Sequence, residues 1–209
     1  MNRLLTTLAL LALAIGVAAA GAAKPKFTSV WKTPAAGDVT LAGKKVAALV
    51  ISNDTDLRVS GEEALVRELG QRGLQGVATY RIAPKEELTD VAKARGWFER
   101  AGVEGVVALR PVSSERRTTY TPSTWANPYY GTLWGYYGYG WNNVYIPGSI
   151  GHETVVTVET LIFSVPKDSL LWAAVSESEE PKTLAAFMKE LVEACVDEMH
   201  KQGLAGKVK

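Results

Sequence analysis

The clearest hydrophobic pattern in the chain is an unbroken apolar run at residues 46–51, within the segment 44–53. A short apolar run without alternation is typical of a strand that is buried on both faces of a sheet. Ser60 stands three residues before Glu63, which is the spacing of a capping box at the start of a helix. A buried strand followed by a capped helix begins a β-α-β unit, so the pattern predicts an α/β fold.

The rest of the chain continues this alternation of strands and helices. Apolar residues that recur every three or four positions predict helices at 60–72, 84–101 and 181–202. Apolar and β-branched runs predict strands at 76–82, 105–109, 153–165 and 170–175. Right-handed crossovers place the first strand between the second and the third. The prediction is a two-layer mixed sheet in strand order 2-1-3-4-5, with three parallel strands, an antiparallel C-terminal hairpin and helices packed on the sheet.

The stretch 113–151, between the third and fourth predicted strands, fits none of these patterns. It contains seven of the eight tyrosines and three of the six tryptophans, and no Lys, Arg, Asp or Glu follows Arg117 until Glu153. A connection this long inside a compact domain is usually functional or disordered. Two interpretations are open: a mobile Gly-rich loop whose rings pack on one another, or a surface that binds a sugar, a peptide or a protein. In either case we expect residues 129–141 to be dispensable for folding, because Gly at 131, 135, 138 and 140 favours backbone freedom.

A candidate binding crevice follows from the topology. In an open α/β sheet, ligands bind at the carboxyl ends of strands where the strand order reverses, which here lies between the first and third predicted strands. The aromatic stretch begins at the end of the third strand, so we expect it to overhang this crevice. The predicted binding residues after the first strand are Ser52, Asn53, Asp54, Thr55 and Asp56. Those in the aromatic stretch are Tyr129, Tyr130, Trp134, Tyr136, Tyr137, Tyr139 and Trp141.

Metal or catalytic chemistry has little support in the sequence. Asp54 and Asp56 alternate as at the start of a calcium loop, but position 12 of that loop is Leu65, where a bidentate Glu is needed. Turn chemistry, in which Asp bonds its own backbone, explains the pair better. The chain has no Gly-x-Ser-x-Gly, Walker or dinucleotide motif and no paired His ligands. We therefore predict no metal, cofactor or catalytic residue, and interpret Arg58 with Glu62 or Glu63 as a structural pair.

Residues 1–23 have the composition of a secretory signal peptide. Arg3 precedes an apolar run at 4–20, and small residues fill 18–23. A membrane anchor is the alternative, but the run is short for a span. No cysteine lies near the cleavage site, so we expect a periplasmic protein without a lipid. The domain prediction is a signal peptide at 1–23, an extended leader at 24–43, and one α/β domain at 44–206 that contains the aromatic loop 113–151.

Charge excludes one class of partner. Lys and Arg number 23 and Asp and Glu 22, and removal of Arg3 makes the two equal. A neutral chain lacks the basic surface that binds nucleic acid or anionic lipid. Cys195 is the only cysteine, so an internal disulfide is impossible. Its place on the apolar stripe of the last predicted helix favours a core residue over a nucleophile or an intermolecular disulfide.

Most of the mature chain resembles small secreted envelope proteins of bacteria, many of them lipoproteins, whose function is unknown. The matching features are the leader around Val30-Trp31, the strand 45–52, the helix 58–69, the strand 77–82 before Pro84, the strand 102–109, the Tyr/Gly-rich insert and the hairpin ending in Leu171-Trp172. At the level of the fold, the chain is similar to the α/β domains of the curli-secretion lipoprotein and of the amino-terminal part of the Tol translocation protein. It departs from the lipoproteins by lacking their cleavage-site cysteine. The resemblance implies an accessory role in the cell envelope.

The expected function is therefore a non-enzymatic periplasmic binding or interaction module, with an envelope protein or a glycan as its partner. Two alternatives come from other classes. One is a small hydrolase or transferase that uses Asp54 and Glu63 at the ends of the first and third strands. The other is a structural subunit that oligomerises through the aromatic stretch.

Overall fold

The computed structural model describes residues 24–34, 40–114, 128–144, 155–179 and 184–202. Its strands are β1 (Lys26–Lys32), β2 (Lys45–Val50), β3 (Gln75–Ala78), β4 (Gly105–Ser114), β5 (Val155–Ser164) and β6 (Ser169–Glu179). Its helices are α1 (Thr55–Gln71), α2 (Thr79–Ile82), α3 (Lys85–Leu88), α4 (Val91–Arg100), α5 (Pro128–Gly131), α6 (Leu133–Asn142) and α7 (Leu184–Lys201). The predicted signal peptide and the stretches 115–127 and 145–151 of the aromatic insert lie outside the described residues.

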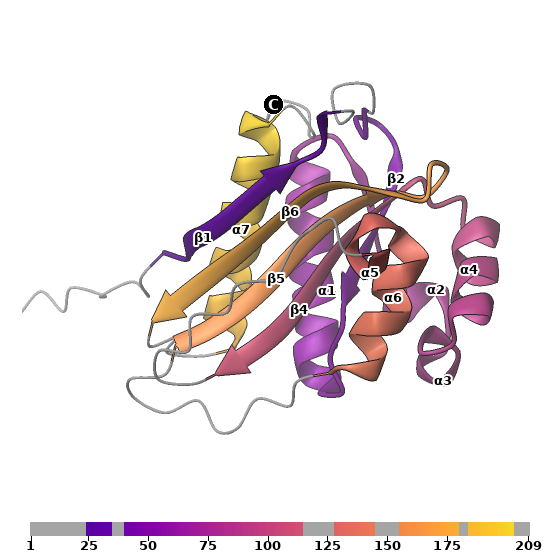
Figure 1. Ribbon diagram of the computed structural model, residues 1–209, viewed down its shortest axis with the longest axis horizontal. Helices are drawn as coiled ribbons and strands as arrows, with labels where there is room; N and C mark the ends of the chain where they lie inside the picture. Colours follow the sequence, from indigo (N-terminus) through magenta and orange to yellow (C-terminus); the bar gives the residue numbers. More distant parts are fainter. Residues whose placement is uncertain (1–23, 35–39, 115–127, 145–154, 180–183, 203–209) are drawn as a thin grey trace, which may run out of the picture.

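The strands form one open sheet in the order β1-β6-β5-β4-β2-β3 (Figure 1). β2 pairs in parallel with β3 and β4, whereas β4, β5, β6 and β1 pair antiparallel. The mixed α/β class, the three parallel strands and the C-terminal hairpin are thus confirmed, and the five predicted strands have the expected neighbours. The complete order differs because residues 26–32 of the expected leader form a sixth strand. Alternate residues of that strand are half-buried, which is the period of a strand with one face on the protein.

Helices cover both faces of the sheet, so the prediction of two layers is wrong. α1 and α7 pack on one face, and α4, α5 and α6 on the other (Figure 1). Each face of the sheet has its own hydrophobic core, and the apolar side chains of residues 46–51 alternate between the two. Val46, Ala48 and Val50 belong to the first, and Ala47, Leu49 and Ile51 to the second. The fold is a three-layer sandwich with the parallel part of the sheet buried on both sides.

Two predicted helix boundaries are wrong because local side-chain hydrogen bonds override the expected caps. α1 begins at Thr55, where the Asp54 carboxylate accepts the N–H groups of Asp56 and Leu57. The Ser60 hydroxyl donates to the Asp56 carbonyl oxygen at 2.7 Å, so it forms no capping box. The helix predicted at 84–101 is two helices, since Asp90 accepts the N–H of Lys93 and starts α4 anew.

The strand predicted at 76–82 is shorter than expected. It ends at Ala78, and residues 79–82 form the helical turn α2. Beyond Ala78, the Thr79 hydroxyl and the Tyr80 N–H donate to the buried carboxylate of Glu62, and no neighbouring strand accepts these hydrogen bonds. The last predicted helix is confirmed over 184–201 as α7, one residue short of its expected end at 202, and its expected start at 181 lies outside the described residues.

Residues 128–142 of the aromatic insert form the helices α5 and α6, and one face of α6 is buried, which contradicts the expectation of a loop that folding can spare. Leu133, Tyr136, Tyr137, Gly140 and Trp141 are all buried and follow the i, i+3, i+4, i+7, i+8 spacing of one helix face. Tyr136 packs on Phe163 of β5 with ring centroids 5.5 Å apart. Tyr137 meets Phe98 of α4 edge-on at 5.9 Å. α6 thus fills the space between the sheet and α4. The glycines hid this periodicity in the sequence.

Cys195 lies on the core-facing side of α7, as expected, with its Sγ 3.3 Å from the Thr160 hydroxyl of β5. Burial raises the pKa of the Cys195 thiol to about 12, and this side chain is therefore protonated and unreactive at neutral pH. Among the described residues no helix is long and apolar enough to span a membrane.

Leu191→Ala should destabilise the protein by about 2–5 kcal/mol, because Leu191 is fully buried between α7 and the sheet and its truncation leaves a cavity. Urea denaturation measures the effect. Lys189→Ala, at an exposed position of the same helix, is the control and should change stability by no more than about 0.5 kcal/mol. An unchanged midpoint in Leu191→Ala would show that α7 does not dock on the sheet.

Candidate functional site

The polar residues after β2 are used mainly to begin α1. Ser52 is fully buried, and its hydroxyl oxygen accepts the N–H of Asp54 at 3.1 Å. Asp54 accepts the N–H of Asp56 at 2.9 Å, which is the turn chemistry expected from the sequence. Thr55 is exposed, and its hydroxyl accepts a hydrogen bond from the Lys85 ammonium group at 3.1 Å. Within the described parts of the chain, no group of three His, Cys, Asp or Glu is placed to hold a metal.

The two carboxylates of the enzyme alternative have separate structural partners. Asp54 caps α1, whereas Glu63 accepts a hydrogen bond from the Tyr80 hydroxyl at 2.5 Å and pairs with Arg81 at 2.8 Å. Glu63 therefore joins α1 to α2 at the surface. Its cationic partner is Arg81. The prediction that Glu63 pairs with Arg58 is therefore wrong.

Helix α6 lies over the crevice predicted at the ends of β2 and β4. A Cβ atom added to Gly140 would be 2.6 Å from Ile51 Cδ1 and 3.6 Å from Arg110 Cδ. The aromatic stretch therefore covers the predicted position. It closes this position with buried side chains, among them Tyr137 and Trp141, and does not overhang an open cleft.

Glu62 fills the gap where β2 and β3 part. Their pairing ends at Ala48 and Ala78. Beyond that point, the Glu62 carboxylate accepts the N–H of Val50 at 3.3 Å and the N–H of Tyr80 at 2.9 Å. It also accepts the Thr79 hydroxyl at 2.5 Å. A side chain of α1 thus replaces the missing hydrogen bonds of the sheet.

The environment of Glu62 changes its titration. Burial raises the pKa of Glu62, and the hydrogen bonds from Thr79, Tyr80 and Val50 and the charge of Arg58 offset this only in part. Arg58 lies one turn before Glu62 on α1 and is itself buried. The charge of Arg58 lowers the pKa of Glu62, but the described residues show no ion pair between the two side chains, so the predicted structural pair with Glu62 is not confirmed.

A second buried polar cluster holds the aromatic insert on the sheet. Arg110 of β4 and Glu159 of β5 are directly opposite in the strand pairing. Arg110 Nη2 lies 2.6 Å, and Nε 3.0 Å, from Glu159 Oε2. Glu159 is fully buried and Arg110 nearly so. Burial of such a pair costs free energy unless further hydrogen bonds satisfy both ions.

The insert supplies those hydrogen bonds. Tyr130 of α5 donates to Glu159 Oε1 at 3.0 Å, and Tyr136 of α6 donates to Glu159 Oε2 at 3.4 Å. Arg110 Nη1 donates to the Asn143 carbonyl oxygen at 3.1 Å. The Arg110 guanidinium also lies 5.2 Å from the ring centroid of Tyr139. Burial, with the charge of Glu159, raises the pKa of Tyr136 well above its usual value, so its hydroxyl stays protonated and donates.

Sequence analysis missed Arg110 and Glu159, two single charged residues that the fold buries, and named Glu62 only as a possible partner of Arg58. Arg110 directly follows the apolar strand 105–109, and Glu159 interrupts the Val/Thr-rich strand 153–165. A lone charge inside a strand that is buried on both faces needs a partner nearby. The opposite charges of Arg110 and Glu159, one in each of two predicted buried strands, could have predicted that these two side chains pair.

Two tyrosines of the insert form its accessible rim. Tyr129 is 54% exposed, and its ring stacks on that of Tyr139 with centroids 5.4 Å apart and an angle of 25°. Tyr139 is half-buried. The other five predicted aromatic residues are buried: Tyr130, Trp134, Tyr136, Tyr137 and Trp141.

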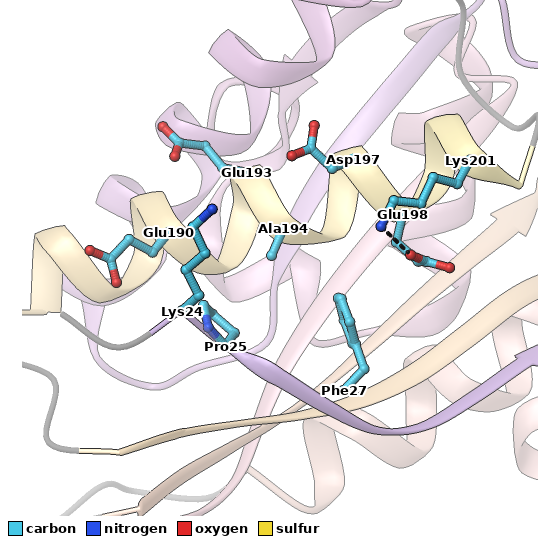
Figure 2. Close-up of a pocket in the computed structure, with 9 residues that line it drawn as sticks. All are labelled: Lys24, Pro25, Phe27, Glu190, Glu193, Ala194, Asp197, Glu198 and Lys201. Atoms are coloured by element: carbon cyan, nitrogen blue, oxygen red, sulfur yellow. Dashed lines mark hydrogen bonds and ion pairs between the residues drawn. The ribbon is translucent and has the colours of Figure 1, made fainter. Parts of the chain in front are cut away.

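A groove of about 530 Å³ lies between the start of β1 and α7 (Figure 2). The α7 side presents acidic side chains, and Lys24, Lys201 and the ring of Phe27 also line the groove. Its acidic residues are Glu190, Glu193, Asp197 and Glu198. Three of them are paired with cations: Glu193 with Lys189, Asp197 with Arg72 and Glu198 with Lys201. The groove is thus a solvent-facing surface whose charges are largely compensated by the described chain.

Comparisons with known proteins find a similarity to solved structures at low identity. No family model and no curated protein matches the chain. The PelC dodecamer from Paraburkholderia phytofirmans is a similar solved structure, with a TM-score of 0.47 and 15% identity over 86% of this chain and 98% of that one. A leucine-to-methionine variant of the PelC dodecamer from the same organism has a TM-score of 0.47 and 16% identity over 86% of this chain and 99% of that one. At these values the function must be argued from the residues of this chain.

Glu62 should give the protein a pH-dependent stability. Its pKa is raised above the ordinary value of 4.5 in the folded state, so the folded protein holds this proton more tightly than the unfolded chain. Its contribution favours folding below pH 4.5 and is lost as the pH rises through the raised value. Urea titrations between about pH 4 and 8 measure the free energy of unfolding of wild type and of Glu62→Gln. The wild-type value minus the Glu62→Gln value should fall as the pH rises.

Glu198→Gln is the matched control, because Gln202 and Lys201 lower the pKa of Glu198. The same difference should then be flat above pH 4.5 and fall as the pH is lowered below that value, because a carboxylate with a lowered pKa stabilises the folded state only while it is ionised. A pH-independent difference for Glu62→Gln would contradict the environment described for Glu62.

Proposed function

We propose that this protein is a non-enzymatic binding module of the bacterial cell envelope, located in the periplasm, that contacts a glycan or an envelope protein through Tyr129 and Tyr139. The N-terminal composition and the resemblance to secreted envelope proteins support the location. The observation that carries the binding role is the exposed, stacked pair of rings: Tyr129, at 54% exposure, is the most exposed large apolar side chain in the described part of the chain.

The pair has the chemistry of a recognition surface. A tyrosine ring offers an apolar face to a sugar ring or an apolar side chain, and its hydroxyl offers a hydrogen bond. The insert near these rings carries no Lys, Arg, Asp or Glu over residues 118–152, so a neutral partner suits it better than an ionic one. A glycan or a neutral protein surface has this character.

The buried network gives the pair a fixed geometry. Tyr139 packs against Arg110, and Tyr130, the neighbour of Tyr129 in the chain, donates to Glu159. Ordered contact residues lose less conformational entropy on binding. The proposal therefore assigns contact to Tyr129 and Tyr139, and support to the five buried aromatic residues of the predicted site.

Tyr129→Ala should lower the affinity for the captured partner by about tenfold or more, since exposed aromatic anchors supply much of the energy of an interface. The thermal midpoint should stay within about 2 °C of wild type, because the side chain is largely exposed. Glycan arrays and capture from envelope extracts measure binding. Tyr129→Phe, which keeps the ring, should retain most of it.

Val30→Ala is the matched control, because Val30 is a 44% exposed apolar side chain on β1, at the far edge of the sheet from β3. It should leave binding unchanged. The proposal fails if Tyr129→Ala binds every partner as wild type does, or if Val30→Ala lowers binding equally.

A further inference from the structure

An open pocket of about 430 Å³ lies beside β3, at one edge of the sheet. Its apolar floor consists of side chains that are half-buried against the core on the α4 and α6 side of the sheet: Val77 of β3, Ile82 of α2, Trp97 of α4, and Ala101 at the end of α4. Because these side chains pack on the core, the floor is held in place. The volume lies in the range of sites for small ligands.

The other residues that line this pocket are three cations from three elements. They are Lys45 of β2, Arg81 of α2 and Arg100 of α4, and no Asp or Glu is among the described residues of the lining. Arg81 pairs with Glu63, whereas Lys45 and Arg100 form no ion pair within the described chain. Two positive charges therefore remain uncompensated at the pocket, although the chain as a whole is balanced.

The Arg100 guanidinium has a defined position and free donors. Its Cζ lies 4.2 Å from the ring centroid of Trp97, and a Cβ atom added to Gly96 would be 3.3 Å from its Nη1. The group therefore lies back along α4, over a ring that is itself fixed because Trp97 Nε1 donates to Glu87 at 2.6 Å. A guanidinium over an aromatic ring keeps its N–H groups for an anion, and planar recognition of phosphate is typical of arginine.

The Lys45 ammonium group lies at the same end of α4. Its Nζ donates to the Ala101 carbonyl oxygen at 2.8 Å, next to Arg100 in the chain. The carboxyl end of a helix favours a cation, which explains this contact. An ammonium group has three N–H donors, so the contact with Ala101 leaves two for a ligand.

We propose that Lys45, Arg81 and Arg100 bind the phosphate group of a small phosphorylated sugar in this pocket. A phosphate monoester carries about −1.5 to −2 charges at pH 7 and three acceptor oxygens, which match the uncompensated charge and the three cationic groups. A carboxylate has one charge and two oxygens, so it matches less well. The apolar floor, with the ring of Trp97, suits the sugar. The site shares no residue with the proposed Tyr129–Tyr139 surface and does not depend on it.

Calorimetry tests the proposal by titration of the purified protein with glucose 6-phosphate, inorganic phosphate and glucose, each at the same ionic strength set with sodium chloride. Wild type should bind glucose 6-phosphate saturably and should not bind glucose. The thermal midpoint should rise with the compound that binds, because a ligand of the folded state stabilises it.

Two variants locate the binding. Arg100→Gln removes an uncompensated charge and its donors, and should weaken binding about tenfold or more, because hydrogen bonds between ionised groups are the strong ones. Without ligand, its thermal midpoint should stay near that of wild type, since Arg100 is exposed. Lys45→Gln removes the second charge from another element and should also weaken binding, by several-fold or more.

Arg95→Gln is the matched control. Arg95 is another exposed arginine of α4, its Cζ lies 4.9 Å from the ring centroid of Trp134, and it does not line the pocket. The substitution makes the same change of net charge on the same helix, so it should bind as wild type.

Each outcome decides the proposal. Binding of glucose 6-phosphate that falls in Arg100→Gln and Lys45→Gln, and not in Arg95→Gln, supports it. The same pattern with inorganic phosphate alone supports the phosphate site and overturns the sugar. The proposal is overturned if neither phosphate compound binds, if Arg100→Gln and Lys45→Gln bind as wild type, or if Arg95→Gln weakens binding equally. If one of the two pocket variants does not fold, the other makes the same comparison with Arg95→Gln.

Discussion

The buried ion pair between Arg110 and Glu159 constrains how the second layer of this fold can be built. Both residues lie on central strands, on the face that also carries Val106, Ala108, Leu161 and Phe163, so their charges cannot be left facing an apolar layer. The aromatic insert solves this problem with the hydroxyls of Tyr130 and Tyr136 and the carbonyl oxygen of Asn143. The insert thus belongs to the core, because the sheet beneath it needs its hydrogen bonds.

Glu62 follows the same physical rule at the other side of β2. There, a carboxylate from α1 accepts the backbone N–H groups that β2 and β3 leave unpaired where they separate. Polar groups at the two sides of β2 are therefore satisfied by segments from elsewhere in the chain. This arrangement closes the crevice at the strand ends and leaves the exposed rim at Tyr129 as the candidate contact surface.

The features that the sequence predicted are those with a strong apolar period. The run at 46–51, the hairpin of β5 and β6, and the stripe of α7 all bury most of their side chains, and each was located from its pattern. β1 was missed because it follows Pro25 and has only one half-buried face. The helical period of α6 was hidden by glycines, which favour flexibility in isolation but here allow close packing, as Gly140 does against Ile51.

The site was less predictable than the fold, because it depends on which charges are buried. The topology located the crevice, and the aromatic stretch does lie over it. No pattern within one segment indicated that Tyr136 would meet a carboxylate on β5, or that Arg110 would pack against Tyr139. Such contacts join residues distant in the chain, and hydrophobic periodicity carries no information about them.

Native-state hydrogen exchange of the α6 amides tests most directly whether the insert is a core layer held by the Arg110–Glu159 pair. In wild type these amides should exchange as slowly as those of α7, since both helices pack on the sheet. In Glu159→Gln, which breaks the buried pair at a cost of about 3–5 kcal/mol, protection should be lost first in α6 and kept in α7. Fast exchange of α6 in wild type, or equal protection of α6 in both proteins, would contradict this account.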